Sequence, residues 1–168
     1  ENVDAIAALS GVERVTPVIS TDVIASQGSN DRSARLVGIE NFAGGGYLNK
    51  LQLLEGEWPR QAGEVVAVHG SAVFDEVEVG DTFQLKTATG TYQDVYAVDS
   101  VTVVGIVSSP DYYYGDGREV SAVGSGVVGT VLFGEADQLY DLQKSTLFSS
   151  LNNEAVTGLL GYEGTIEI

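Results

Sequence analysis

Leu53-Leu54-Glu55-Gly56-Glu57-Trp58-Pro59 opens the stretch that decides the fold of this chain, and the stretch continues to Val107. Short apolar segments alternate in it with turns rich in Gly, Pro and acidic residues, and it carries the only tryptophan among the 168 residues. Gly56 and Pro59 bracket Trp58, so we expect a turn that leaves the indole ring free to cover the end of a sheet. No constellation of catalytic residues is recognisable in this stretch.

The segments after Trp58 predict a row of strands. Val65 to Val68 is an unbroken apolar run, which favours a strand buried on both faces. Residues 79–82, Val-Gly-Asp-Thr, are typical of a turn, because glycine tolerates positive φ and aspartate can bond the neighbouring backbone. Further strands are expected over residues 83–87, 92–98 and 101–107, the last two forming one long strand or two strands with a kink between them. These pieces predict a small antiparallel β-rich unit.

Outside this stretch, helical and strand patterns alternate. Val3, Ile6 and Leu9 have helical spacing, and Ser10-Gly11 would end that helix. A hairpin is expected next, with strands over residues 12–25 and 33–39 and a polar turn between them. Short helices are expected at residues 71–74 and 135–142, a short helix or turn at 47–54, a loop that links two lobes at 41–46, and strands at 127–133 and 165–168.

The composition limits the possible partners. Lys and Arg total 8 against 24 Asp and Glu, which gives a net charge of −16. Such a charge repels nucleic acids and anionic lipid headgroups. It leaves two alternatives, a soluble acidic surface or a surface that attracts cationic peptides or Ca²⁺. The absence of cysteine excludes disulfides, a thiol nucleophile and a zinc site with cysteine ligands. No apolar run of membrane-spanning length and no signal peptide is present.

The order of several short motifs resembles a known family. Leu-x-Glu-Gly-x-x-Pro at residues 53–59 is followed by Gly-Glu-Val-Val at 63–66, Val-Gly-Asp-Thr at 79–82 and Val-Val-Gly-Ile-Val-x-Ser-Pro at 103–110. Each motif alone is ordinary turn and strand chemistry, and the specific part is their order and spacing. On this basis the chain resembles the extracytoplasmic domain of FtsX/MacB-type ABC transporter permeases. In that family the domain lies between the first and second membrane helices.

The resemblance implies an α+β fold in two lobes. A porter-like lobe would contain both chain ends, residues 1–52 and 126–168, and an inserted β-rich lobe would span residues 53–125. The abrupt start at Glu1 and the stop inside a strand-like segment favour a domain cut from between two membrane helices. We therefore expect a domain on the extracytoplasmic side of the cell membrane, held there by flanking helices.

The function implied by the resemblance is not catalytic. ATP turnover by a cytoplasmic subunit would move the membrane helices, and this domain would pass the motion to an unidentified substrate or partner protein outside the membrane. The full permease would be a dimer. Neither a cofactor nor a metal is expected, and the sequence gives no role in binding nucleic acid.

A tyrosine-rich loop, residues 108–119, is the candidate partner site. Three consecutive tyrosines cannot all face a core, and exposed aromatic rings give a large contact area at low entropy cost. The alternative is that the rings fold back to close the sheet. The residues predicted to bind the partner are Asp111, Tyr112, Tyr113, Tyr114 and Asp116. A Ca²⁺ site formed by Asp111, Asp116 and Glu119 is an alternative, although their spacing matches no known calcium loop.

Two other function classes stay open. One is a secreted or surface β-rich binding module without any link to an ABC transporter. The other is a hydrolase that uses Ser71 and His69, which are close in sequence but lack an identifiable third group. The triple glycine at residues 44–46 is not followed by Lys-Ser or Lys-Thr, so it does not favour a nucleotide site.

Overall fold

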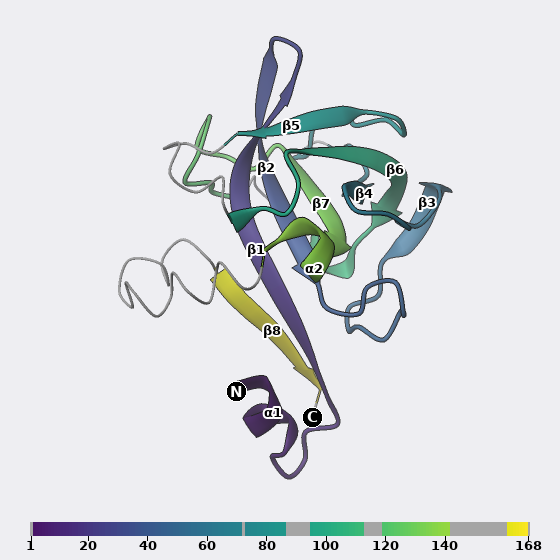
Figure 1. Ribbon diagram of the computed structural model, residues 1–168, viewed down its shortest axis with the longest axis vertical. Coiled ribbons are helices and arrows are strands. Elements are labelled where there is room, and N and C mark those ends of the chain that lie inside the picture. The colour runs from purple at the N-terminus through teal and green to yellow at the C-terminus, as the bar shows by residue number, and fades with distance from the viewer. Residues whose placement is uncertain (1, 72, 87–94, 113–118, 142–160, 168) are drawn as a thin grey trace.

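The computed structural model describes residues 2–71, 73–86, 95–112, 119–141 and 161–167. It is mostly β-sheet with few helices, which is compatible with the predicted α+β class (Figure 1). The elements follow in the order α1 (Asn2–Ala7), β1 (Arg14–Gln27), β2 (Asn30–Ile39), β3 (Gln52–Gly56), β4 (Glu64–Val68), β5 (Thr82–Lys86), β6 (Ser100–Ser108), the 3-10 helix η2 (Pro110–Tyr112), β7 (Thr130–Glu135), α2 (Ala136–Leu139) and β8 (Gly161–Glu167).

Six of the described strands close into a barrel. Their order is β2-β7-β4-β6-β5-β1, and β1 pairs with β2 again, so the ring of hydrogen bonds returns to its start. The pairs β2–β7 and β4–β6 are parallel, and the other pairs in the ring are antiparallel. Closure removes most of the free strand edges that an open sheet would expose. Strand β3 lies outside the ring and pairs with β6.

The core is divided between the two faces of the sheet. One cluster collects side chains from all six barrel strands and fills the barrel, with α2 packed against it. The other covers the outer face of β2, β7 and β4 and includes aromatic residues from the loop before β3. In β4, Val65 and Ala67 join the first cluster, whereas Val66 and Val68 join the second. The predicted burial of this strand on both faces is therefore confirmed.

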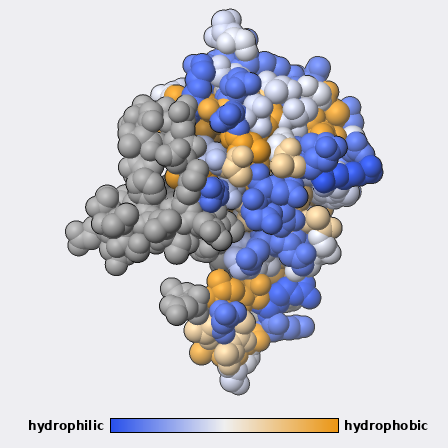
Figure 2. Space-filling view, in the orientation of Figure 1, coloured by the Kyte–Doolittle hydropathy of each residue, from blue (hydrophilic) through white to orange (hydrophobic). Residues whose placement is uncertain are grey.

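Strand β1 extends well beyond the barrel. Residues 14–20 pair with β8, residues 18–27 pair with β2, and residues 24–26 pair with β5. Helix α1 and the end of β8 therefore lie at the same end of the molecule, below the barrel in Figure 1. In the space-filling view the surface over the barrel is largely hydrophilic, and hydrophobic residues gather toward the end that carries α1 (Figure 2).

Most predicted strands are confirmed, but three local predictions are wrong. The helix predicted over residues 71–74 is absent at the described residues Ser71, Val73 and Phe74, where the Ser71 hydroxyl accepts hydrogen bonds from the amides of Val73 and Phe74. In the predicted strand 92–98, the described residues 95–98 form only an isolated bridge, between Tyr96 and Tyr140. The β-rich unit is not purely antiparallel, because residues 69–99 make a connection long enough for β4 and β6 to pair in parallel.

Two helix predictions need smaller corrections. The helix predicted at residues 135–142 is shorter, since α2 ends at Leu139 and Tyr140 turns to an extended conformation. The segment predicted as a helix or turn at residues 47–54 is a bend that leads into β3. The division into lobes, residues 1–52 with 126–168 and residues 53–125, stays a prediction. Among the residues that the structure describes, no helix has the length and hydrophobicity needed to cross a membrane.

Candidate functional site

The predicted partner loop begins at η2, directly after β6. Asp111 is exposed and Tyr112 is half-buried. The ring of Tyr112 makes edge contacts with Phe74 and Phe133, with centroids 5.9 Å and 6.0 Å apart. Tyr112 thus folds back onto the outer core, as one of the two alternatives expected. Tyr113, Tyr114 and Asp116 lie outside the described residues, so the role of the loop in partner binding stays a prediction.

Tyr112 and Asp111 border a cavity of about 400 Å³. It lies against the outer face of β1, β2 and β7, under the loop that precedes β3. The side chains from β1 that face it are Thr16, Val18 and Ser20, which alternate along the strand as side chains on one face must. The other described lining residues are Val37, Ile39, Leu48, Asn49, Leu51 and Phe133.

The mouth of the cavity is held by polar contacts between separate segments. The amide Nδ2 of Asn49 donates a hydrogen bond of 2.8 Å to the Asp111 carboxylate, which ties the loop before β3 to η2. The backbone amide of Leu48 donates to Thr16 Oγ1 at 2.9 Å, which ties the same loop to β1. Asn49 has φ of 54°, a left-handed conformation that asparagine tolerates better than most residues. The loop is thus positioned by both of its neighbours.

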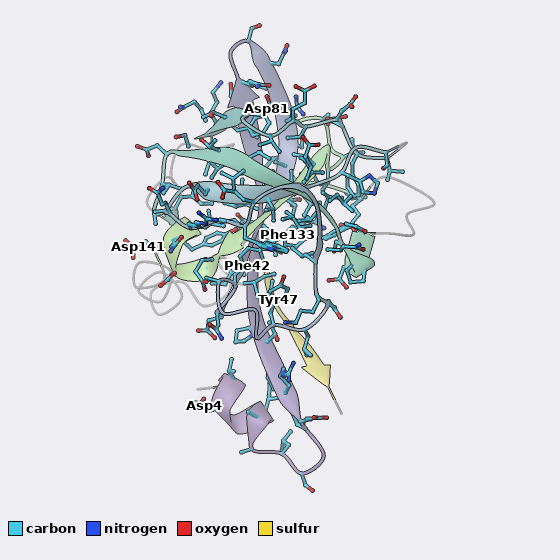
Figure 3. The ribbon with its side chains drawn as sticks, turned by 90° about the vertical axis from the view of Figure 1, so that its right-hand side faces the viewer. Asp4, Phe42, Tyr47, Asp81, Phe133 and Asp141 are labelled. Carbon is cyan, nitrogen blue, oxygen red and sulfur yellow. The ribbon has the colours of Figure 1, made fainter. Side chains whose placement is uncertain are left out.

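We call residues 41–51 the strap, because this loop covers the outer core beside the cavity. Its Phe42 and Tyr47 rings lie 5.2 Å apart, and Trp58 packs edge-on against Phe42 at 5.8 Å. Figure 3 shows Phe133, Phe42 and Tyr47 close together in the middle of the molecule. Trp58 keeps 39% of its surface exposed. Its ring contact is with the strap, and the expectation that it covers the end of a sheet stays a prediction. The triple glycine belongs to this strap.

A second cavity, of about 580 Å³, contains His69 and Ser71. The two side chains do not bond each other in the described contacts. His69 Nδ1 lies 2.8 Å from the carbonyl of Gly70, to which it donates, and Ser71 Oγ accepts from two backbone amides. A hydrolase would instead need a base on the serine hydroxyl. The geometry therefore offers no activated nucleophile at this pair.

The carboxylates of the alternative Ca²⁺ site have separate partners. Glu119 pairs with Arg35, which also bonds Asp22 at 2.9 Å, whereas Asp111 bonds Asn49. Asp116 lies outside the residues described. Within the described ranges, no group of three or more His, Cys, Asp or Glu side chains is arranged to hold a metal ion.

Sequence reasoning missed the cavity. Its lining comes from β1, β2, the strap, η2 and β7, which are far apart in the chain. The one local signal was the alternation of Thr16, Val18 and Ser20, which indicates a strand face that is neither fully apolar nor fully polar. That pattern does not reveal what lies opposite.

Comparison with known proteins identifies relatives. A family model described as MacB-like periplasmic core domain matches residues 1–149. Among solved structures, the chain is similar to the extracellular domain of the noncanonic ABC-type transporter YknZ from Gram-positive bacteria, with 12% identity, a TM-score of 0.49, and coverage of 98% of this chain and 70% of that one. It is also similar to the periplasmic region of MacB from Actinobacillus actinomycetemcomitans, with 17% identity, a TM-score of 0.42, and coverage of 99% and 77%. No curated protein sequence matches it.

Proposed function

This chain belongs to the family of MacB-like periplasmic core domains, and from that premise we propose that it is a non-catalytic relay in an ABC transporter permease. ATP turnover by a cytoplasmic subunit moves the membrane helices, and this extracytoplasmic domain passes the motion to a substrate or partner protein outside the membrane. The full permease is a dimer in this proposal. The family itself supports an extracytoplasmic transporter domain, and the relay and the dimer are our additions.

The observation that carries the proposal is the length of β1. Its first half pairs with β8 beside α1, and its second half is part of the barrel. A single strand therefore runs from the end of the molecule where the described chain begins and ends to the far rim of the barrel. A continuous hydrogen-bonded strand is a stiff connection, which a relay needs.

The predicted lobes share the barrel, since β1, β2 and β7 belong to one and β4, β5 and β6 to the other, and they move together in the proposal. In the proposal, residues 1–52 with 126–168 form the porter-like lobe next to the membrane helices, and residues 53–125 form the inserted β-rich lobe. The partner is held by the loop that contains Asp111, Tyr112, Tyr113, Tyr114 and Asp116. Support for this loop comes from its described residues Asp111 and Tyr112, which line a cavity, since concave surfaces beside loops are common binding sites.

Spin-label distances in the full permease test the relay. One label at Gln84, which is exposed, is placed in each copy of the dimeric permease. We expect the distance distribution between the two copies to change between the ATP-bound and nucleotide-free states. A control pair at Glu13 and Gln84 within one copy spans β1, because Gln84 pairs with Ser26, and is expected to stay constant. If the distance between the copies also stays constant while ATP turnover is normal, the relay through this domain is refuted.

Partner binding by the loop has its own test. Tyr112, Tyr113 and Tyr114 are replaced together by Ala in the full transporter complex, and transport or partner capture is measured. We expect a loss of at least tenfold, because aromatic anchors often contribute 2 kcal/mol or more to an interface. Normal activity with normal folding would remove the loop from the proposal and leave the relay untouched.

A further inference from the structure

The cavity beside η2 has an apolar floor and a polar mouth. Val37, Ile39, Leu51 and Phe133 line it and are each at most 7% exposed. Asn49 and Asp111 line it as well, and both are exposed. Its volume of about 400 Å³ lies at the lower end of the roughly 300–1,000 Å³ typical of small-molecule sites. The shape suits a compact molecule with an apolar body and one polar head.

The charge of the mouth selects the head group. Asp111 is the only charged side chain among the described residues that line the cavity. The nearest lysine in sequence, Lys50, points elsewhere, since its ammonium bonds the Gly45 carbonyl and lies 5.2 Å from the centroid of the Tyr47 ring. With a chain charge of −16 around it, this mouth repels anions. A cationic head group would form an ion pair with the Asp111 carboxylate.

Hydrogen bonds within the protein already fix the position of that carboxylate at the mouth of the cavity. Asn49 donates to Asp111 at 2.8 Å, which fixes the carboxylate at the rim and leaves further lone pairs for a second donor. The Thr16 hydroxyl is occupied by the Leu48 amide and holds the strap over the floor. A ligand would therefore find an ordered rim and would not have to order the loop itself.

We propose that this cavity binds a small organic cation, with its apolar body on the floor formed by β2, β7 and the strap and its ammonium group at Asp111. The site goes beyond the relay, because it requires neither ATP-driven motion nor a partner protein. It shares Asp111 and Tyr112 with the predicted partner loop, so its test is made on the 168-residue chain without partner or nucleotide. A failed relay or failed partner binding would leave the result of that test unaffected.

Three probes with the same aromatic body and different heads test the proposal: 2-phenylethylamine, 2-phenylethanol and 3-phenylpropanoate. Each is titrated into the ¹⁵N-labelled chain, and backbone amide shifts are followed by NMR. We expect the amine to shift the signals of Val37, Leu48 and Phe133 and to bind at least about fivefold more tightly than the alcohol, as one ion pair near water predicts. The carboxylate is expected to bind weakest.

Two variants separate charge from shape. Asp111→Asn keeps an oxygen that can accept from Asn49 but removes the charge, so amine and alcohol should then bind about equally. Asp137→Asn, an exposed acid outside the cavity lining, is the matched control and should leave the preference unchanged. Ser20→Leu fills the cavity and should weaken all three probes. Equal affinities in the unmodified chain, shifts confined to other regions, or an amine preference that survives Asp111→Asn would each overturn the proposal, even if Ser20→Leu fails to fold.

Discussion

Replacing Tyr140 by Phe tests whether the hydroxyl of this residue, which follows α2, stabilises the core of the barrel. Tyr140 is 1% exposed, and its hydroxyl donates to the Leu36 carbonyl at 2.5 Å. The same hydroxyl lies 3.0 Å from Thr21 Oγ1, which is also 3.0 Å from the hydroxyl of Tyr96. Each hydroxyl has one proton, so the proton of Tyr140 goes to Leu36, that of Thr21 goes to Tyr140, and that of Tyr96 goes to Thr21.

Tyr140→Phe interrupts this series of hydrogen bonds in the middle. The Leu36 carbonyl loses a donor and the Thr21 hydroxyl loses its acceptor, both inside the core. Leaving a buried polar group unsatisfied costs about 1–3 kcal/mol, so we expect Tyr140→Phe to lower the free energy of unfolding by about 2 kcal/mol. Tyr96→Phe removes only the terminal donor of a half-buried ring and should cost about 0.5–1 kcal/mol.

Urea unfolding, followed by the fluorescence of Trp58, measures these free energies. A double substitution with Thr21→Val provides the second half of the test. Because it replaces both partners of one hydrogen bond, its cost should be smaller than the sum of the two single costs by about 0.5–1.5 kcal/mol. If Tyr140→Phe costs no more than Tyr96→Phe, or if the two changes at Tyr140 and Thr21 add without coupling, the hydrogen-bond chain does not stabilise the barrel.

The remaining predictions concern pH, packing and catalysis. Burial raises the pKa of Tyr140 well above its ordinary 10.0, so above about pH 10 the folded chain keeps a proton that the unfolded chain loses. The free energy of unfolding should therefore be unaffected by this group below about pH 10 and then fall by about 1.4 kcal/mol per pH unit until the raised pKa is passed. Tyr140→Phe should remove this fall, as urea unfolding at pH 9–11 would measure. Gly38→Ala should lower the free energy of unfolding by about 1–3 kcal/mol, because the added Cβ would lie 2.9 Å from Ala136 Cα and 3.0 Å from the Tyr140 ring. Gly46→Ala is the control and should cost less than about 0.5 kcal/mol, because its Cβ would contact only the flexible amide of Asn41. A panel of ester, amide and phosphate substrates should show no turnover with the unmodified chain; turnover that His69→Ala abolishes would establish the hydrolase alternative.

The residue pattern within single strands correctly predicted which of their side chains are buried. The apolar run of β4 predicted burial on both faces, and Val65 and Val66 indeed point into different cores. The alternation of β5 also predicted its pattern, with Phe83 and Leu85 buried and Gln84 exposed between them. In both strands the side-chain period of two and the hydrophobicity of a few neighbours are sufficient.

Long-range pairing could not be predicted in this way. Closure of the barrel depends on β2 and β7 pairing in parallel across about a hundred residues, from Ala34–Thr130 to Ile39–Glu135. Nothing in either strand specifies that register, because β7 and the end of β2 from Leu36 to Ile39 are apolar on both faces. The cavity depends on the same closure, since Val37 and Phe133 reach its floor only once these strands are neighbours.

The point where β1 leaves the barrel connects the two proposals. Val18, Ile19 and Ser20 are the residues of β1 that pair with β2 on one side and with β8 on the other. A strand bonded on both sides bends less readily than an edge strand, so motion of the α1 end would be carried through these residues and not absorbed by them. Val18 and Ser20 also line the cavity. A cation bound there would therefore contact the segment that the relay must use, and occupancy of the cavity would change the nucleotide-dependent distance between the Gln84 labels of the two copies if both proposals hold.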